Sequence, residues 1–161
     1  MTDVRVRRQR RKSLAFKVTP AGAVALIPLE MQADGPEVWQ FIANALAELP
    51  EPEYRAQALA PGAVREIVTS WTGRLGVEVT RTQIRAMRTK WGSISTAGTL
   101  TLADDLLRLP DDLIEYVIVH ELLHLKFPNH RKGWRVSMGM YVPDWRERER
   151  RLQACQQALA T

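Results

Sequence analysis

The sequence contains little cysteine, little histidine and no long apolar run. Its one cysteine, Cys155, excludes an internal disulfide and is typical of proteins from a reducing compartment. No apolar stretch approaches the about 20 residues that a membrane-spanning helix needs. The basic N-terminus is not followed by the apolar segment of a secretory signal, because Lys17 ends the short apolar run at residues 14–16. We therefore expect a cytoplasmic protein that has no membrane partner.

The length and composition predict an ordinary globular chain. At 161 residues it is expected to form one domain over residues 1–161, with residues 1–50 as an N-terminal β-hairpin and helix and residues 61–161 as the core. Hydrophobic residues make up 45% of the chain, which is enough for a core without disulfides.

A basic run occupies the N-terminal residues 3–12. Its cations are Arg5, Arg7, Arg8, Arg10, Arg11 and Lys12. Such a run is often a solvated edge or a disordered arm, and the alternative is a patch that contacts nucleic-acid phosphates. Val4 and Val6 alternate with the charged residues, so part of the run is expected to be an edge strand. The net charge of +5 permits an acidic partner but does not establish one.

Turn residues and apolar periodicity divide the rest of the chain into short elements. Two β-prone runs, residues 13–18 and 23–27, surround a Pro/Gly turn and predict a hairpin that ends at Pro28. The expected helices cover residues 34–49, 63–75, 110–127, 133–140 and 144–159, and the further strands are expected at 77–79, 83–87 and 99–102. Gly76 is expected to end the second of these helices.

All three histidines of the protein, His120, His124 and His130, lie within eleven residues. The first two lie on a helix that is expected to begin at Pro110, where the missing N–H costs nothing. Apolar residues occur on almost every side of this helix, which indicates a buried helix. Polar side chains on a buried helix need partners, so the histidines call for an explanation.

The spacing of these polar residues predicts a metal site. Residues four apart on a helix are offset by only ~40° and about 6 Å, so His120 and His124 point the same way and can share a metal ion. Glu121 lies roughly 100° from His120, where it can reach a water on the metal without binding the metal itself. This His-Glu-x-x-His arrangement is typical of zinc hydrolases, in which the carboxylate is the general base.

The third ligand, His130, depends on where the helix ends. In a continued helix His130 would lie about 240° from His124. Pro128 disfavours a helical Phe127 and Asn129 tolerates a left-handed turn, so we expect the helix to end at or before Phe127 and the chain to fold back. Three neutral imidazoles then leave a fourth position for water, which is the composition of a catalytic zinc site.

The same residues allow a plainer interpretation, in which His120 and His124 are core histidines and Glu121 is their partner. The third histidine behind a helix end, and the lack of histidine elsewhere, favour a metal site with one zinc ion per chain. Three imidazoles and a water suit zinc, although nickel or cobalt would also bind. Tyr141 could donate to an oxyanion, but an aromatic residue in such a place is more often packing.

Four segments of the chain together resemble the YgjP-like metallopeptidases, which are related to the SprT and WLM proteases. The segments are RTKWGSIS (88–95), GTLTL (98–102), YVIVHELLH (116–124) and NH (129–130). The family pattern usually has Cys and Asn where this chain has Ile94 and Ala103. The resemblance implies an α+β, zincin-like fold in which a small antiparallel β-sheet packs against the buried HExxH helix, with an N-terminal β-hairpin and a C-terminal helix. It also implies the three histidines as metal ligands and Glu121 as the base.

The first functional hypothesis is a zinc-dependent metallopeptidase, a hydrolase that cleaves peptide bonds with a metal-bound water activated by Glu121. Its partner would be a peptide or protein substrate, added as an extra strand beside an edge strand at residues 99–102. The second is a basic nucleic-acid-associated protein with a structural metal site. Glu121 argues against it, because a structural site needs no carboxylate beside its ligands and normally has four protein ligands. The SprT and WLM proteases suggest that both can coexist, in proteolysis of DNA-bound proteins.

Overall fold

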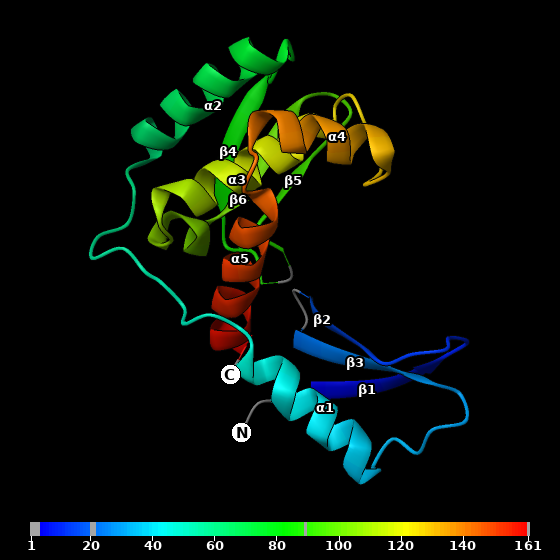
Figure 1. Cartoon of the computed structure of the whole chain (residues 1–161). Helices are drawn as coiled ribbons and strands as arrows, with labels where there is room; N and C mark the ends of the chain where they lie inside the picture. Colours follow the sequence, from blue (N-terminus) through cyan, green and yellow to red (C-terminus); the bar gives the residue numbers. More distant parts are fainter. Residues whose placement is uncertain (1–3, 20–21, 89, 161) are drawn as a thin grey trace. The chain divides into compact units, whose positions relative to one another are not determined.

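A computed structural model describes residues 4–19, 22–88 and 90–160 of the chain (Figure 1). These residues form a mixed α+β fold, and their contacts group into two compact units. The first unit comprises residues 4–52 together with 150–160, and the second comprises residues 53–149. One domain over residues 1–161 stays a prediction.

The first unit is built on a three-stranded sheet with the strand order β1-β3-β2. β2 (Ala15–Thr19) and β3 (Gly22–Pro28) pair antiparallel, which confirms the predicted hairpin and its end at Pro28. The expected turn residues 20 and 21 lie outside the described residues. β1 (Val4–Gln9) pairs parallel with the other side of β3, so the basic run does contain an edge strand.

The core of the first unit lies between this sheet and α1 (Pro36–Ala47). Val38 and Ile42, four residues apart on the helix, are buried and pack with Ala25 and Ile27 of β3. Residues two apart on a strand share a face, and residues four apart on a helix do so as well. One apolar face from each element therefore forms the core of this unit.

The second unit contains a helix, another three-stranded sheet and the helices that follow it. α2 (Pro61–Leu75) ends at Gly76, whose φ of 65° makes the left-handed C-cap that the sequence predicts. The strands are β4 (Arg81–Arg85), β5 (Gly92–Ile94) and β6 (Thr99–Ala103), in the order β4-β6-β5. A short 3-10 helix, η1 (Asp104–Arg108), connects β6 to the next helix.

The second sheet differs from the predicted one, which was antiparallel with residues 99–102 at its edge. It is mixed, because β6 pairs parallel with β4 and antiparallel with β5. The strand expected at residues 99–102 is present as β6, but its predicted place at the edge is wrong. β6 lies in the centre of the sheet, and its Leu100 and Leu102 are fully buried. The buried hydroxyl of Thr101 accepts a hydrogen bond from Nε2 of Gln83 on β4 at 2.8 Å, so its polarity did not mark a solvent-facing side.

The strand expected at residues 77–79 is also wrong. Residues 77–79 follow the C-cap of α2 without forming a strand, and the N–H of Val77 is already used by the carbonyl of Thr72, to which it donates at 3.1 Å. The strand begins later, at Arg81, after the N–H of Thr80 has bonded the carbonyl of Gly98 at 2.9 Å. β-prone residues alone do not make a strand where the backbone has another partner.

α3 (Asp111–Leu123) is the buried helix that its apolar pattern predicts. It contacts α2, β5 and α4 (Lys132–Tyr141), as can be followed in Figure 1. Pro110 is the N-cap and not the first helical residue, because its ψ of 151° is extended. Across the described residues, no helix is both long and apolar enough to cross a bilayer.

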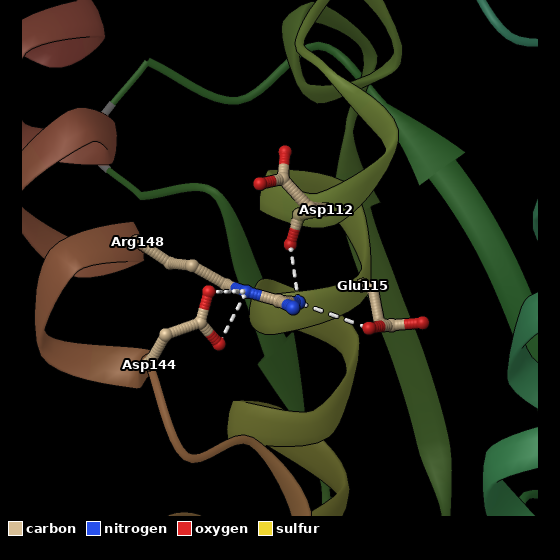
Figure 2. Close-up of polar contacts among 4 residues, drawn as sticks. All are labelled: Asp112, Glu115, Asp144 and Arg148. Atoms are coloured by element: carbon tan, nitrogen blue, oxygen red, sulfur yellow. Dashed lines mark hydrogen bonds and ion pairs between the residues drawn. The ribbon is translucent and has the colours of Figure 1, made fainter.

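Arg148 joins the start of α5 (Trp145–Ala160) to α3 within the second unit (Figure 2). Its Nη1 donates to Oε1 of Glu115 at 2.9 Å and to the carbonyl of Asp112 at 3.1 Å, and its Nε donates to the carboxylate of Asp144. The side chain of Arg148 is 16% exposed, whereas those of Glu115 and Asp144 are 36% and 57% exposed. Water therefore screens the partners more than it screens the guanidinium.

We expect Arg148→Ala to lower the free energy of unfolding by about 1–2 kcal/mol, because a carbonyl and two carboxylates lose a charged donor while the partners stay partly hydrated. Urea unfolding of the two proteins measures the difference. Arg65→Ala, at an exposed position of α2, is the matched control and should change stability by less than about 0.5 kcal/mol. Equal losses in both variants would show that the Arg148 contacts contribute nothing specific.

Candidate metal centre

α3 ends in a tightened turn. The regular helix stops at Leu123, and the N–H groups of the next three residues donate to carbonyls three residues back at 3.0–3.1 Å. The N–H of Phe127 then closes the turn on the carbonyl of Leu123 at 2.8 Å. The helix therefore ends before Phe127, as Pro128 predicts.

The chain turns back after the helix as predicted, but the conformation of the turn differs from the predicted one. Among the described residues only glycines have positive φ, so the left-handed conformation expected for Asn129 is wrong. Instead, Oδ1 of Asn129 accepts the N–H of Arg131, the N-cap residue of α4, at 3.0 Å. A short polar side chain that bonds the backbone two residues on can turn the chain without a left-handed residue.

The three histidines converge at this return. His120 lies in α3, His124 directly follows it and His130 lies in the loop before α4. One ring nitrogen from each lies within 4.8 Å of the others, and the Nε2 atoms of His120 and His130 are 3.0 Å apart. Nitrogens at ~2.0–2.1 Å from one tetrahedral zinc ion are separated by about 3.3 Å. The donor set and its spacing therefore fit a zinc ion after small side-chain rotations.

The second ring nitrogen of His124 has a fixed role. Nδ1 of His124 lies 2.9 Å from the carbonyl oxygen of Phe127. A carbonyl only accepts hydrogen bonds, so Nδ1 carries the proton and the lone pair lies on Nε2. Metal-binding histidines commonly have such an outer hydrogen bond, which fixes the tautomer and the ring orientation. The carbonyl of Phe127, just after the end of the helix, thus orients the ring of His124.

Trp134 of α4 forms the floor of the histidine cluster. Its side chain is 2% exposed, and its ring centroid lies 4.9 Å from that of His120, 6.1 Å from that of His124 and 4.8 Å from that of His130. A buried, tightly packed indole ring limits the rotation of the three imidazoles and excludes water from the side of the cluster that faces α4.

Burial keeps the imidazoles ready to accept a cation. Burial, followed by the neighbouring His124 and His130, lowers the pKa of His120 to about 3. Burial also lowers the pKa of His130, again with a contribution from His124. Both rings are therefore neutral at pH 7, and only a neutral imidazole can act as a metal ligand.

Glu121 is a half-buried carboxylate beside the cluster. Burial raises the pKa of Glu121 to about 7, and the positive charge of Lys90 opposes this rise. A carboxyl with a pKa near neutral can both take up and release a proton under physiological conditions. Neither its neighbour Lys90 nor the adjoining Gly92 was singled out from the sequence, because contact between β5 and α3 has no local signal.

Burial of Glu121 should make the stability of the metal-free protein depend on pH. The pKa of glutamate in an unfolded chain is about 4.3, whereas the folded protein raises it to about 7. The folded state therefore keeps a proton that the unfolded state releases. The resulting contribution to stability is fully present below the pKa of the unfolded chain and is lost as pH rises through the pKa of the folded protein. Relative to Glu121→Gln, the free energy of unfolding of the wild type should fall by about 3 kcal/mol between these two pKa values.

Urea unfolding of both proteins in the presence of a chelator measures this difference. The opposing contribution of His120, whose lowered pKa favours folding as pH rises, is common to both proteins and cancels in the comparison. A difference that does not change with pH would show that the Glu121 carboxyl is not buried as the structure has it.

Tyr141 belongs to the packing of α4 and not to the histidine cluster. Its ring meets Trp71 of α2 edge-on, with the centroids 6.2 Å apart. The plainer of the two interpretations offered for this residue, aromatic packing, is therefore the one that the contact supports.

Comparisons with known proteins agree with this geometry. The family model described as the YgjP-like metallopeptidase domain matches residues 43–155. Similar solved structures include the metallopeptidase zymogen of Pyrococcus abyssi abylysin, which is 26% identical with a TM-score of 0.50 over 55% of this chain and 90% of that chain. The metallopeptidase zymogen of Methanocaldococcus jannaschii jannalysin is 26% identical with a TM-score of 0.51, over 59% of this chain and 96% of that chain. A search of curated proteins finds no match.

Proposed function

Because the chain belongs to the YgjP-like metallopeptidase family, we propose that its three converging histidines hold one zinc ion and that Glu121 is the general base of peptide-bond hydrolysis. Family membership places the protein among metal-dependent hydrolases that act on peptides or proteins. The observation that carries the finer proposal is the convergence of three imidazoles beside a half-buried carboxylate, that of Glu121, which lies on the same helix as His120.

The chain's own residues supply binding, orientation and proton transfer. A zinc ion held by the imidazoles would polarise the scissile carbonyl and make water easier to deprotonate. Glu121 takes the proton of the attacking water and passes it to the leaving amine, which its raised pKa of about 7 permits. The carbonyl of Phe127 holds His124 in the correct tautomer, and Trp134 keeps water from the lower side of the cluster.

The substrate would add beside β5. In the second sheet β5 is an edge strand and contacts α3, whereas β6 is central. An extended peptide can pair with an exposed strand edge through main-chain hydrogen bonds. This arrangement would bring the scissile bond past Glu121, because Gly92 of β5 lies directly against that side chain.

A structural role for the metal is less well supported. Closed structural zinc sites normally have four protein ligands, whereas the candidate group in the described part of the chain has three. The core-histidine interpretation is weaker still. One neutral ring donating to the other would account for the 3.0 Å between Nε2 of His120 and Nε2 of His130, but it would not account for the third ring nitrogen, from His124, within 4.8 Å of both.

Hydrolysis of an unfolded protein substrate by the zinc-loaded chain tests the proposal. Cleavage should disappear when a chelator removes the metal and return when zinc is added back. No cleavage of any unfolded protein or peptide mixture by protein that contains zinc would overturn the proposed activity.

A second candidate function rests on the charge of the first unit. Residues 4–29 contain no Asp or Glu, and their Lys and Arg residues are Arg5, Arg7, Arg8, Arg10, Arg11, Lys12 and Lys17. Most of the side chains of the edge strand β1 are exposed. Such a surface suits the phosphate backbone of a nucleic acid, and binding there should weaken steeply as salt is raised. Binding that is absent at low salt, or insensitive to salt, would exclude this candidate.

A further inference from the structure

Gly92 occupies a position at which a side chain has no room. It lies on the edge strand β5, opposite Leu102 of β6, and faces α3. A Cβ atom placed on Gly92 would lie 3.2 Å from Cγ of Glu121, 3.3 Å from Cδ2 of Leu102 and 3.3 Å from Cγ1 of Val117. Real Cβ atoms rarely come this close to so many neighbours, so one of the three would have to move.

The backbone does not explain glycine at this position. The glycines with positive φ are Gly76 and Gly98, and Gly92 is not among them. Any residue could therefore adopt the backbone conformation of Gly92. The lack of a side chain matters here because of the space it leaves and not because of the conformation it permits.

The neighbours of this space differ in how easily they can move. Leu102 and Val117 are 0% and 4% exposed, and buried apolar side chains in a close-packed core have few alternative positions. β5 itself is held by its pairing with β6 and by the carbonyl of Trp91, which accepts the N–H of Ala103 at 2.8 Å. Glu121 is only half-buried and its side chain has more rotatable bonds. An added methyl group would therefore displace Glu121 first.

We propose that Gly92 is a positioning residue that holds the carboxylate of Glu121 in line for proton transfer. Val117 and Glu121 lie one turn apart on α3, so Gly92 and Val117 enclose the methylene chain of Glu121 from two sides. The inference rests on the proposed function, since the position of Glu121 affects catalysis only if Glu121 is the base. It adds to that function a residue that acts by leaving space for the side chain of Glu121.

Kinetics of Gly92→Ala test the catalytic consequence. A misplacement of about 1 Å can cost about 100-fold in rate, so a shift of a few tenths of an ångström is expected to lower kcat by about 10-fold. Zinc affinity should not change, because the three atoms nearest the added methyl group belong to Glu121, Leu102 and Val117 and not to a histidine. KM should not change either, because the methyl group would point toward α3 and not along the edge of β5 where the substrate would pair. Gly73→Ala is the matched control, since a Cβ on Gly73 of α2 meets nothing within 4 Å, and it should leave kcat, KM and zinc affinity unchanged.

A double variant separates action through Glu121 from action on the substrate. Gly92→Ala should lower the residual rate of Glu121→Gln no further, because the base is already missing. An additive loss in the double variant, a rise in KM with kcat unchanged, or a loss of zinc affinity in Gly92→Ala alone would overturn the proposal. Unchanged kcat in Gly92→Ala would do so as well.

A crystal structure of Gly92→Ala tests the placement without any assay of activity. We expect the Glu121 side chain to be displaced while β5, Leu102 and the imidazoles keep their positions. Movement of β5 or Leu102 with Glu121 in place would overturn the inference even if the protein is a peptidase. Displacement of Glu121 in a protein that cleaves nothing would instead leave the placement correct and the proposed function wrong.

A second variant covers the case in which Gly92→Ala does not fold. Adding Val117→Ala removes the methyl group that the new Cβ would meet at 3.3 Å and leaves the 3.2 Å contact with Cγ of Glu121. The same kinetic and crystallographic results are expected for this pair, relative to Val117→Ala alone.

Discussion

Replacing Glu121 by Gln is expected to leave zinc bound and to lower kcat for peptide hydrolysis by about 100-fold to about 10,000-fold, the usual contribution of a general base. The amide has nearly the size of the carboxyl group, but it cannot take up the proton of the attacking water. Because none of the three proposed metal ligands is altered, zinc affinity should stay near that of the wild type. The measurement is kcat at matched zinc content.

The matched control for this variant is Glu115→Gln. Glu115 also lies on α3, but it bonds Arg148, and it is not part of the histidine cluster. We expect it to retain the wild-type rate at a temperature well below its unfolding midpoint. A Glu121→Gln variant that cleaves as fast as the wild type would show that the assigned base is wrong.

Replacing His124 by Ala is expected to abolish tight zinc binding. The change removes one ligand and also leaves the carbonyl of Phe127 without its donor. Losing only an outer partner of a metal ligand typically costs 10–100-fold in metal affinity, so losing the ligand itself should cost more than about 100-fold. Competition with a chromophoric chelator measures the two affinities.

Thermal unfolding gives a second readout of the same loss. Zinc at about 100 times its dissociation constant should stabilise the wild type by about 2.7 kcal/mol, and the same zinc concentration should leave His124→Ala nearly unchanged. Lys126→Ala, at an exposed position of the same turn, is the control and should respond to zinc as the wild type does. Equal stabilisation of His124→Ala and the wild type would remove His124 from the ligand set.

The features that sequence reasoning predicted well are those with local causes. The acidic first turn and the apolar residues on every side of α3 define a buried helix without reference to any other segment. The end of that helix before Phe127 follows from Pro128, whose ring excludes the helical conformation of the residue before it. The convergence of the three histidines then follows from the spacing of two of them and the return of the third.

The features that it predicted wrongly depend on partners elsewhere in the chain. The parallel pairing of β4 with β6 joins strands that are not neighbours in sequence, and nothing within residues 99–102 shows that Gln83 will cover Thr101. Asn129 has a known tolerance for left-handed turns, but the N–H of Arg131 was close enough for its side chain to bond. The contact between Gly92 and Glu121 likewise needs the packing of β5 on α3.

Metal analysis of the protein purified without a polyhistidine tag tests the central claim most directly. We expect about one zinc ion per chain after incubation with zinc and removal of the excess, because the three converging imidazoles would together hold a single ion. Protein that stays free of zinc after this treatment would contradict the account and would make His120, His124 and His130 ordinary histidines of the protein.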